Sequence, residues 1–406
     1  MNFHHSLYTL IVVTIGVLAH ANTSWAGDWD VAGQASLELR YFPYTAVHAN
    51  QRNITVSPSG TIEPELVYEW NGGRDRFTLT PFARFDTDDH RRTHADLREV
   101  NWLHVGSDWD LLIGIGKVFW GVTESVHLVD IVNQTDAVED ISGEKKLGQP
   151  MINFTIEKQW GVFNVIALPG FRTRTFTSDS ARLHGPLPVD WSNETYESSR
   201  GQRHIDWAVR WSRSFGDIDI AISHFQGTSR EALLTLHNRG GVPVTVPHYS
   251  QIGQTGLELQ WTTENTLWKA EAMSRSGHGK RFYATASGFE HTLYDVGESG
   301  VDVGLLMEYL SDNRDVRFAP ASGADNDMFA GARFVLNDTQ DTSALVGGIY
   351  DLQNHAVFVN LETERRITDH LKVEINARFF VNVPDNDLFA LIRSDDYVEM
   401  KLNWFF

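Results

Sequence analysis

The stretch DRFTLTPFARFD, residues 75–86, alternates two kinds of side chain along its length. One face carries apolar side chains, at Phe77, Leu79, Pro81, Ala83 and Phe85. A period of two residues is typical of a β-strand whose faces meet different surroundings. The same pattern recurs in HIDWAVRW, residues 204–211, and in HLKVEINARFF, residues 370–380. We therefore expect a protein built from amphipathic strands.

About 18 segments of this kind follow one another, and most have the roughly 9–11 residues that a tilted strand needs to cross a bilayer. The links between them differ in length in a regular way. Short turns, the first at Asn71-Gly72-Gly73, follow every even-numbered strand, whereas all the long links follow odd-numbered strands. A membrane barrel with both chain ends in the periplasm requires this order, and a soluble β-sandwich does not. The predicted fold is all-β: a transmembrane, antiparallel, up-and-down β-barrel.

The composition excludes several other classes of protein. The formal net charge is −19, whereas phosphate is bound by clusters of Lys and Arg, so we expect no nucleic-acid partner. The chain has no cysteine, which removes disulfides and Cys-ligated metals. After residue 26 no apolar run reaches the roughly 18 residues that indicate a membrane-spanning helix.

The N-terminal segment has the outline of a cleaved secretory signal. LYTLIVVTIGVL, residues 7–18, is uncharged and apolar, and the small residues Ser24 and Ala26 precede Gly27. We expect residues 1–26 to be a signal peptide. Residues 27–406 show no change of composition and no linker, so they are predicted to form a single outer-membrane barrel domain in a Gram-negative bacterium.

The stretch EMKLNWFF, residues 399–406, repeats the alternation with Met400, Leu402, Trp404 and Phe406 on one face. Pairing of this strand with the first one would close the sheet and remove both of its open edges. The stretch resembles the recognition signal of Gram-negative outer-membrane barrels, with Trp404 and Phe406 as its aromatic positions. This resemblance implies insertion by the barrel-assembly machinery, with outer-membrane lipid around the barrel.

Tryptophans gather close to the predicted short turns. Indole rings prefer a membrane interface, where one edge is apolar and the N–H stays hydrated. The short turns are therefore expected at the periplasmic interface. The tryptophans concerned are Trp70, Trp109, Trp160, Trp211, Trp261 and Trp268.

The alternation assigns the second face of each strand to the barrel interior, and that face is rich in charge. Burying many ions in a dry interior costs several kcal/mol each unless every one is paired. A barrel of about 16–18 strands is wide enough for an aqueous channel, which avoids this cost. The alternative is a closed interior held by Arg–Glu networks. The side chains assigned to the lumen include Arg84, Arg210, Arg275, Glu374 and Arg378.

Residues 109–151 form the most informative segment. Gly114, Gly116 and Gly121 reduce the side-chain volume where another segment can approach the wall. The segment resembles a pattern in a family of Gram-negative outer-membrane barrels catalogued as a domain of unknown function: Gly-basic-x-x-x-Trp-Gly-x-x-Glu, an Ile-Asn segment, an acidic-basic cluster and Pro-Met. The matching positions are Gly116, Lys117, Trp120, Gly121, Glu124, Ile131, Asn133, Asp136, Glu144, Lys145, Lys146, Pro150 and Met151.

The chain departs from this family pattern at two positions. Lys117 stands where the family usually has Arg, and Gln134 stands where a Pro is usual. Alginate-export barrels are similar in strand number and in an early Gly-basic strand motif. Both resemblances imply a channel or exporter-like role, and neither fixes the solute.

Our mechanistic hypothesis is that residues 121–149 fold into the lumen and narrow it. Their excess of carboxylates over Lys145 and Lys146 would favour small cationic or neutral polar solutes. The residues expected to set the constriction and its selectivity are Lys117, Glu124, Asp130, Asp136, Glu139, Asp140 and Glu144.

Two clusters of possible metal ligands have a simpler interpretation. Residues 86–96, DTDDHRRTHAD, and residues 323–327, GADND, contain several Asp and His side chains. Neither matches the spacing of an EF-hand loop or an HExxH zinc site. We interpret both as solvent-exposed outer loops and expect neither a metal nor a cofactor.

Two other functions stay open as alternatives. Ser223 with His224, or His204 with Asp206, could belong to a lipid-modifying enzyme, but no GxSxG pattern is present, so we expect no enzyme. The long links 171–202 and 228–251 favour a surface-binding or adhesion barrel. The sequence leaves the oligomeric state open.

Overall fold

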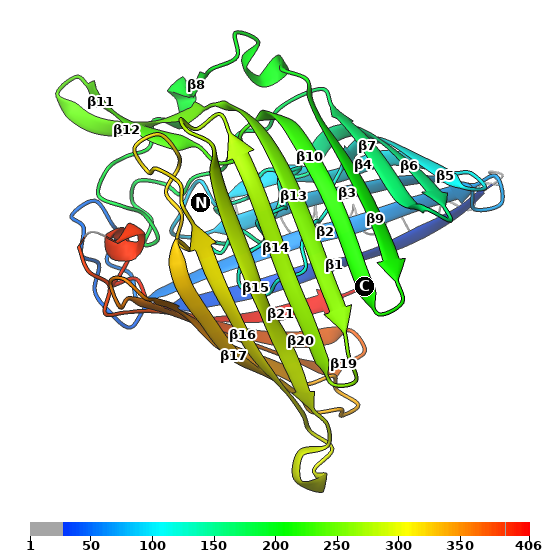
Figure 1. Ribbon diagram of the computed structural model, residues 1–406. Helices are drawn as coiled ribbons and strands as arrows, with labels where there is room; N and C mark the ends of the chain where they lie inside the picture. Colours follow the sequence, from blue (N-terminus) through cyan, green and yellow to red (C-terminus); the bar gives the residue numbers. More distant parts are fainter. Residues whose placement is uncertain (1–26, 386) are drawn as a thin grey trace, which may run out of the picture.

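A computed structural model describes residues 27–385 and 387–406, and they form a closed antiparallel β-barrel (Figure 1). Its sheet has 18 strands, and β1 pairs with both β2 and β21, which closes the cylinder. The predicted barrel is therefore confirmed, while the predicted signal peptide, residues 1–26, lies outside the described residues.

Each barrel strand overlaps one of the predicted period-two segments, although β1 and β2 begin several residues earlier than predicted. The barrel strands are β1 (Gly27–Tyr41), β2 (Val56–Trp70), β3 (Asp75–Asp86), β4 (His94–Val105), β5 (Trp109–Gly116), β6 (Gln149–Lys158), β7 (Gly161–Leu168), β9 (Asp206–Phe215), β10 (Ile218–Thr228), β13 (Gln251–Thr262), β14 (Thr266–Ser276), β15 (Phe282–Leu293), β16 (Asp302–Asp312), β17 (Asn326–Val335), β18 (Ser343–Asp351), β19 (Val357–Thr368), β20 (Leu371–Val381) and β21 (Tyr397–Phe405).

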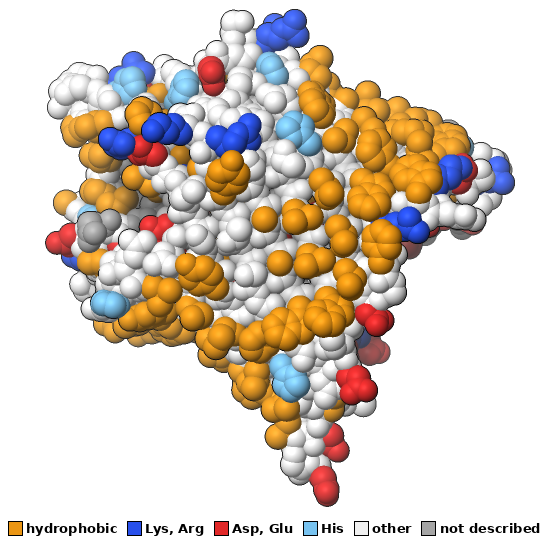
Figure 2. All heavy atoms as spheres, viewed as in Figure 1, with side chains coloured by type: hydrophobic (Ala, Val, Ile, Leu, Met, Phe, Trp, Pro, Cys, Tyr) orange, Lys and Arg blue, Asp and Glu red, His pale blue; other side chains and the backbone are white. Residues whose placement is uncertain are grey.

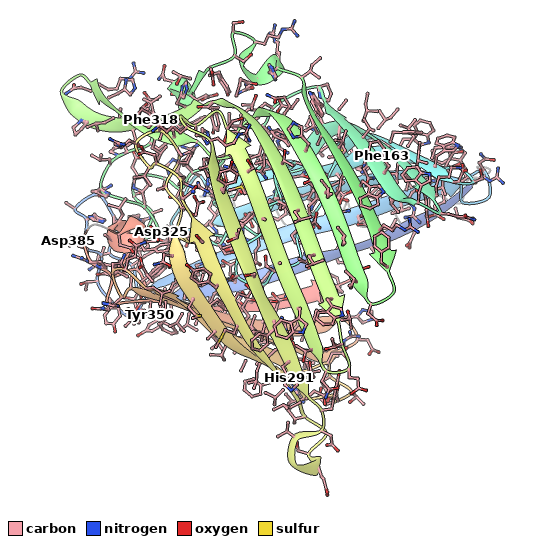
Figure 3. The ribbon with its side chains drawn as sticks, viewed as in Figure 1. Phe163, His291, Phe318, Asp325, Tyr350 and Asp385 are labelled. Atoms are coloured by element: carbon pink, nitrogen blue, oxygen red, sulfur yellow. The ribbon has the colours of Figure 1, made fainter. Side chains whose placement is uncertain are left out.

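The short turns, the first described residue Gly27 and the last residue Phe406 share one end of the cylinder. The longest of these turns, between β15 and β16, includes the 3₁₀ helix η3 (Val296–Glu298) and projects from that end (Figure 1). The long links meet at the other end. Figure 3 shows Phe318, Asp325 and Asp385 at this outer rim and His291 towards the turns. The predicted alternation of short and long links is thus present in the fold.

The outer wall is apolar because every second side chain points away from the barrel. Along β1, Leu37 and Leu39 are 67% and 48% exposed, whereas the intervening Glu38 is 3% exposed. Figure 2 shows apolar side chains across this wall and acidic ones at the tip of the β15–β16 turn. Near the turns, Trp268 packs on Phe289 with ring centroids 5.3 Å apart. No helix among the described residues is long and apolar enough to cross a membrane.

Closure of the cylinder depends on backbone pairing at the last residues. Gly33 and Phe406 exchange two backbone hydrogen bonds of 3.0 and 3.1 Å. A Cβ atom on Gly33 would lie 2.7 Å from the Cα of Pro64 and 2.9 Å from the ring of Phe406. The strand junction is therefore too close for any other residue at position 33 without a local shift.

A second, small sheet lies at the outer rim, and the period-two analysis did not predict it. Strands β11 (Leu233–Arg239) and β12 (Val242–Tyr249) form a hairpin that projects beyond the barrel, and β12 also pairs with β8 (Thr195–Tyr196) (Figure 1). The remaining elements at this end are the 3₁₀ helices η1 (Trp191–Asn193), η2 (Gly201–Arg203) and η4 (Leu388–Leu391).

Candidate functional site

Residues 117–148, which connect β5 to β6, contact the inner wall of the barrel; we call them the inner segment. Strand β5 ends at Gly116. From there Trp120, Val129, Ile131 and Val132 pack in one buried apolar cluster with side chains of β6, β7, β9, β10 and β13. The wall side chains in this cluster are Met151, Ile166, Leu168, Ala208, Phe225 and Ile252.

The predicted lumen was polar throughout and did not include this apolar sector of the inner wall. A sequence pattern that indicates the sector is nevertheless present. Val165, Ile166, Ala167 and Leu168 are four consecutive apolar residues, and such a run is typical of a strand covered on both faces. Outward-facing Val165 is 40% exposed, whereas Ile166 and Leu168 are 1% and 0% exposed beneath the inner segment.

Two carboxylates of the opposite wall hold the first part of the inner segment through its backbone. Glu271 of β14 accepts hydrogen bonds from the N–H groups of Val122 and Thr123, at 2.7 and 3.0 Å. Glu308 of β16 accepts from the N–H groups of Glu124 and Ser125, at 2.7 and 2.9 Å. Hydrogen bonds to a charged acceptor are the strong kind. The inner segment is therefore fastened to β14 and β16 at consecutive residues.

Gly121 and Asn133 allow the inner segment to take this position against the wall. Gly121 has a φ of 137°, and a Cβ atom there would lie 2.9 Å from the Glu271 carboxylate, so a side chain would be strained. The Asn133 side chain is buried, accepts from the N–H of Val118 and donates to the carbonyls of Gly116 and Leu147. It thereby ties the start of the inner segment to its end.

Four of the seven predicted selectivity residues make ion pairs. Glu139 accepts two hydrogen bonds from Arg84 of β3, at 2.7 and 2.8 Å. Arg84 in turn binds Glu38 of β1 at 2.9 Å. The other three pairs are Asp136 with Arg98 at 2.6 Å, Asp130 with Lys146 at 3.2 Å, and Glu124 with Arg333 at 2.8 Å.

The pKa values follow from these contacts. Burial raises the pKa of Glu139, but the Arg84 guanidinium outweighs it and brings the pKa below its usual range. For Asp130, burial wins over the attraction of Lys146 and raises the pKa. Glu139 is therefore the more firmly ionised of the two carboxyls.

Lys117, Asp140 and Glu144 differ from the other four, because they make no ion pair within the described part of the chain. Glu144 lines three neighbouring cavities, of 720, 330 and 400 Å³, which lie on different sides of the inner segment. Burial, reinforced by Asp140 and Glu362, raises the pKa of Glu144. Of the predicted residues, Glu144 is the one placed where these open spaces meet.

The five lumen charges named above are all in ion pairs. Arg210 binds Glu258 at 2.8 Å, and Arg378 binds Glu362 at 2.9 Å. The remaining pairs are Arg84 with Glu38 and Glu139, Arg275 with Glu231 at 2.9 Å, and Glu374 with Lys372 at 3.2 Å. The wall thus contains paired charges and water-accessible cavities together.

Arg84→Ala is expected to destabilise the barrel strongly. The Arg84 side chain is 4% exposed, and its loss would leave Glu38 and Glu139 buried and without this partner. Breaking such a pair from one side costs about 3–5 kcal/mol. The measurement is the urea midpoint of the heat-modifiable folded band, compared with Arg366→Ala. Arg366 is 53% exposed and paired only with exposed Asp341, so its replacement should leave the midpoint nearly unchanged.

The structure corrects the interpretation of residues 86–96 as a solvent-exposed loop. Asp86, Asp89 and Arg92 are 5%, 6% and 3% exposed. Arg92 binds Asp86 at 2.8 Å, and Asp89 accepts from the backbone N–H of Ser178. These charges are buried because the link between β7 and β9, which contains Ser178, packs over them.

His94 of the same stretch lies with Asp136 and Glu139 in a group whose ligand atoms are within 4.8 Å of one another. Arg98 and Arg84 already bind the two carboxylates, so this group is part of the salt-bridge network. A second group, Asp325, Asp327 and Asp351, lies at the outer ends of β17 and β18 (Figure 3).

The two histidines considered for catalysis do not meet a serine in the described structure. His204 binds Asp206 at 2.7 Å, and Asp206 also binds Arg230 at 2.8 Å. His224 contacts Thr255 at 2.9 Å, whereas the adjacent Ser223 is 5% exposed on the other face of β10. A Ser-His-Asp unit is therefore not assembled by these residues.

A scan against protein-family models and a search of curated proteins both returned no match. The resemblances to the family of unknown function and to the alginate-export barrels therefore stay predictions. Solved structures do match over most of the chain, at identities that show only the fold.

Two similar structures are OccAB3 of Acinetobacter baumannii and a BenF-like porin from Pseudomonas fluorescens Pf-5, each 9% identical with a TM-score of 0.52. The first match covers 93% of this chain and 99% of the other, and the second covers 94% and 98%. Wzi of Escherichia coli, described as a carbohydrate-binding barrel, is 9% identical with a TM-score of 0.50, over 97% of this chain and 87% of that one. The closed strand order and these similar structures show that the chain has the fold of an outer-membrane porin, a closed 18-stranded antiparallel β-barrel.

Proposed function

We propose that the protein is a channel for small polar solutes, neutral or cationic, whose lumen is narrowed by residues 121–149. The observation that supports this most is the fastening of residues 122–125 to Glu271 and Glu308 while Glu139 binds Arg84. These contacts lie on β14, β16 and β3, so the segment reaches across the interior. A chain that crosses a lumen in this way reduces its open cross-section.

The proposed preference for cations follows from the excess of carboxylates around the cavity at the narrowing. Asp140 and Glu144 face the 400 Å³ cavity, which is lined by nine carboxylates and six cationic side chains. Charged rings of this kind set ion selectivity by raising the local concentration of counter-ions. The paired residues Glu124, Asp136 and Glu139 would contribute less, because their partners cancel most of their field.

The test is the conductance of the refolded mature chain in a planar bilayer, with a reversal potential measured across a KCl gradient. We expect discrete conductance steps and a modest cation preference. Absence of conductance would contradict the channel, and a clear anion preference would contradict the role given to the carboxylates.

Glu144→Lys is expected to remove the cation preference or to invert it. The change alters the local charge by two units, and one unit charge at about 4 Å in water contributes about 1 kcal/mol before screening by salt. The shift of the reversal potential reports it directly. Glu298→Lys on the projecting periplasmic turn is the matched control, because that residue lies outside the cavities described here.

Acid is expected to weaken the cation preference of the unmodified channel. The raised pKa of Glu144 means that its carboxylate takes up a proton at a higher pH than an ordinary glutamate. The charge of Glu144 is lost as the pH falls through this raised pKa. In Glu144→Gln the reversal potential should respond less to pH over the same interval. An equal response in both proteins would exclude Glu144 as the titrating group.

A surface-binding role is the second candidate, and one exposed contact favours it. Trp191 is 51% exposed at the outer rim, and the Arg91 guanidinium lies 4.1 Å from the centre of its ring. An exposed indole of this kind can stack on the apolar face of a sugar ring. Capture of glycans by whole cells, lost in Trp191→Ala while conductance is unchanged, would support this role alongside the channel.

A further inference from the structure

Two adjoining cavities beside the inner segment carry opposite net charge. The first, of 330 Å³, lies against β1–β4 and is lined by six cationic side chains and three carboxylates; we call it the lysine cavity. The second, of 400 Å³, lies mainly against β17–β21 and is lined by nine carboxylates and six cationic side chains; we call it the carboxylate cavity. They adjoin because both linings include Arg84, Glu139, Glu144, Lys145 and Lys401.

The positive charge of the lysine cavity is not cancelled by local pairing. Arg84 and Arg98 bind carboxylates, so their charges are compensated. Lys117, Lys145 and Lys401 instead make no ion pair with any residue that the structure describes. Their ammonium groups are therefore available to a solute.

The carboxylates where the two cavities adjoin also divide into those that a cationic side chain binds and those that it does not. Glu124 is bound by Arg333, and Glu362 is bound by Arg378. Asp140 and Glu144 have no cationic partner among the described residues. Unpaired charges of the two signs thus face the same water-accessible space from neighbouring positions, with Lys145 next to Glu144 in the chain.

We propose that this pair of cavities selects solutes that carry both charges, that is, zwitterions of the amino-acid type. The carboxylate of such a solute lies towards Lys145 and Lys401, and its ammonium lies towards Asp140 and Glu144. A solute of net charge zero with separated charges gains from both cavities, whereas a simple ion gains from one and is repelled by the other. The inference rests on the proposed channel and specifies its class of substrate.

The experiment compares two isomers in proteoliposome swelling: β-alanine, which is a zwitterion at neutral pH, and lactamide, which is uncharged. Their equal composition removes size as the cause of any difference, and protein-free liposomes correct for direct permeation. We expect β-alanine to pass roughly threefold faster than lactamide, a ratio that weak, hydrated charge contacts can sustain.

Two variants locate the effect. Lys145→Gln with Lys401→Gln should lower the β-alanine rate to that of lactamide, while the lactamide rate stays unchanged. Asp140→Asn with Glu144→Gln should also lower the β-alanine rate to that of lactamide, because it removes the carboxylates that face the ammonium of the solute. Lys158→Gln is the matched control, because Lys158 lies at the periplasmic end of β6 and is paired with Asp108. A collapsed barrel would lower both rates together, so the unchanged lactamide rate also reports folding.

The outcomes separate this inference from the proposed channel. Equal rates for the two isomers in the unmodified protein, or an unchanged ratio in the lysine variant, would overturn the zwitterion preference and leave the channel intact. Failure of both isomers to pass would overturn the channel and this inference with it.

Discussion

Replacing Glu271 and Glu308 together with Ala is expected to raise the single-channel conductance and to make the current fluctuate. In the native barrel these carboxylates accept five backbone hydrogen bonds, four of them from the consecutive residues 122–125 and one from Val129. A hydrogen bond to a charged group contributes about 1.5–3 kcal/mol. Without the acceptors, the start of the inner segment keeps only the ion pairs of the Glu124 side chain with Lys269 and Arg333.

Hydrogen exchange measures the release of residues 122–125 from the wall without a measurement of ion flow. The amides of Val122–Ser125 should exchange slowly in the native protein and quickly in the double variant. The amides of Ile131 and Val132 should stay slow in both, because the apolar cluster still holds that part. This contrast distinguishes local release from general loosening of the barrel.

Glu258→Ala is the matched control for this prediction. Glu258 is another buried carboxylate of the inner wall, but it binds Arg210 of β9 rather than the inner segment. It should leave the exchange of residues 122–125 unchanged. Equal conductance and equal protection in the double variant and the native protein would show that other contacts fix the constriction.

Deleting residues 404–406 is expected to prevent stable assembly. The deletion removes the pairs Ala35–Trp404 and Gln34–Phe405 and the two hydrogen bonds between Gly33 and Phe406. Backbone groups left unpaired in a membrane cost several kcal/mol each. We also expect the barrel-assembly machinery to recognise the aromatic positions Trp404 and Phe406. The loss of folded protein should therefore exceed what the lost backbone pairing alone would cause.

The measurement is the amount of heat-modifiable folded protein in the outer-membrane fraction. Deletion of Val296–Glu298 is a control of the same length, because these residues lie in the projecting turn and outside the barrel ladder. Trp404→Ala with Phe406→Ala keeps the backbone pairing and removes the aromatic rings. Normal assembly of this last variant would mean that closure, and not recognition of the rings, requires the terminal residues.

The strand order was predictable because one physical rule acts on every barrel strand. Lipid outside and water or polar groups inside impose a period of two, and the links at the two ends differ in length. Glu38 between Leu37 and Leu39 illustrates the rule, and pairing of β1 with β21 follows from it. The hairpin of β11 and β12 was missed because it lies beyond the membrane, where this rule no longer applies.

The partners of the charged residues could not be predicted from one sequence. The presence of acidic residues in the inner segment was evident, but the choice between Glu139, bound by Arg84, and Glu144, without an ionic partner in the described structure, depends on how the chain folds across the lumen. Glu271 and Glu308 were not singled out, because a wall carboxylate that binds backbone N–H groups has the same pattern as one that faces water.

The apolar cluster beneath the inner segment limits how far the proposed pore can change its width. Moving Trp120, Val129, Ile131 and Val132 into water would forfeit about 1.5–3 kcal/mol for each side chain. A membrane voltage or a passing solute does not readily supply this much free energy. The part of the inner segment that contains these side chains is therefore expected to stay rigid. Fluctuations in the width of the proposed pore are then confined to the hydrated stretch that contains Asp140 and Glu144. A small displacement of this stretch changes both the opening and the charge that a solute meets.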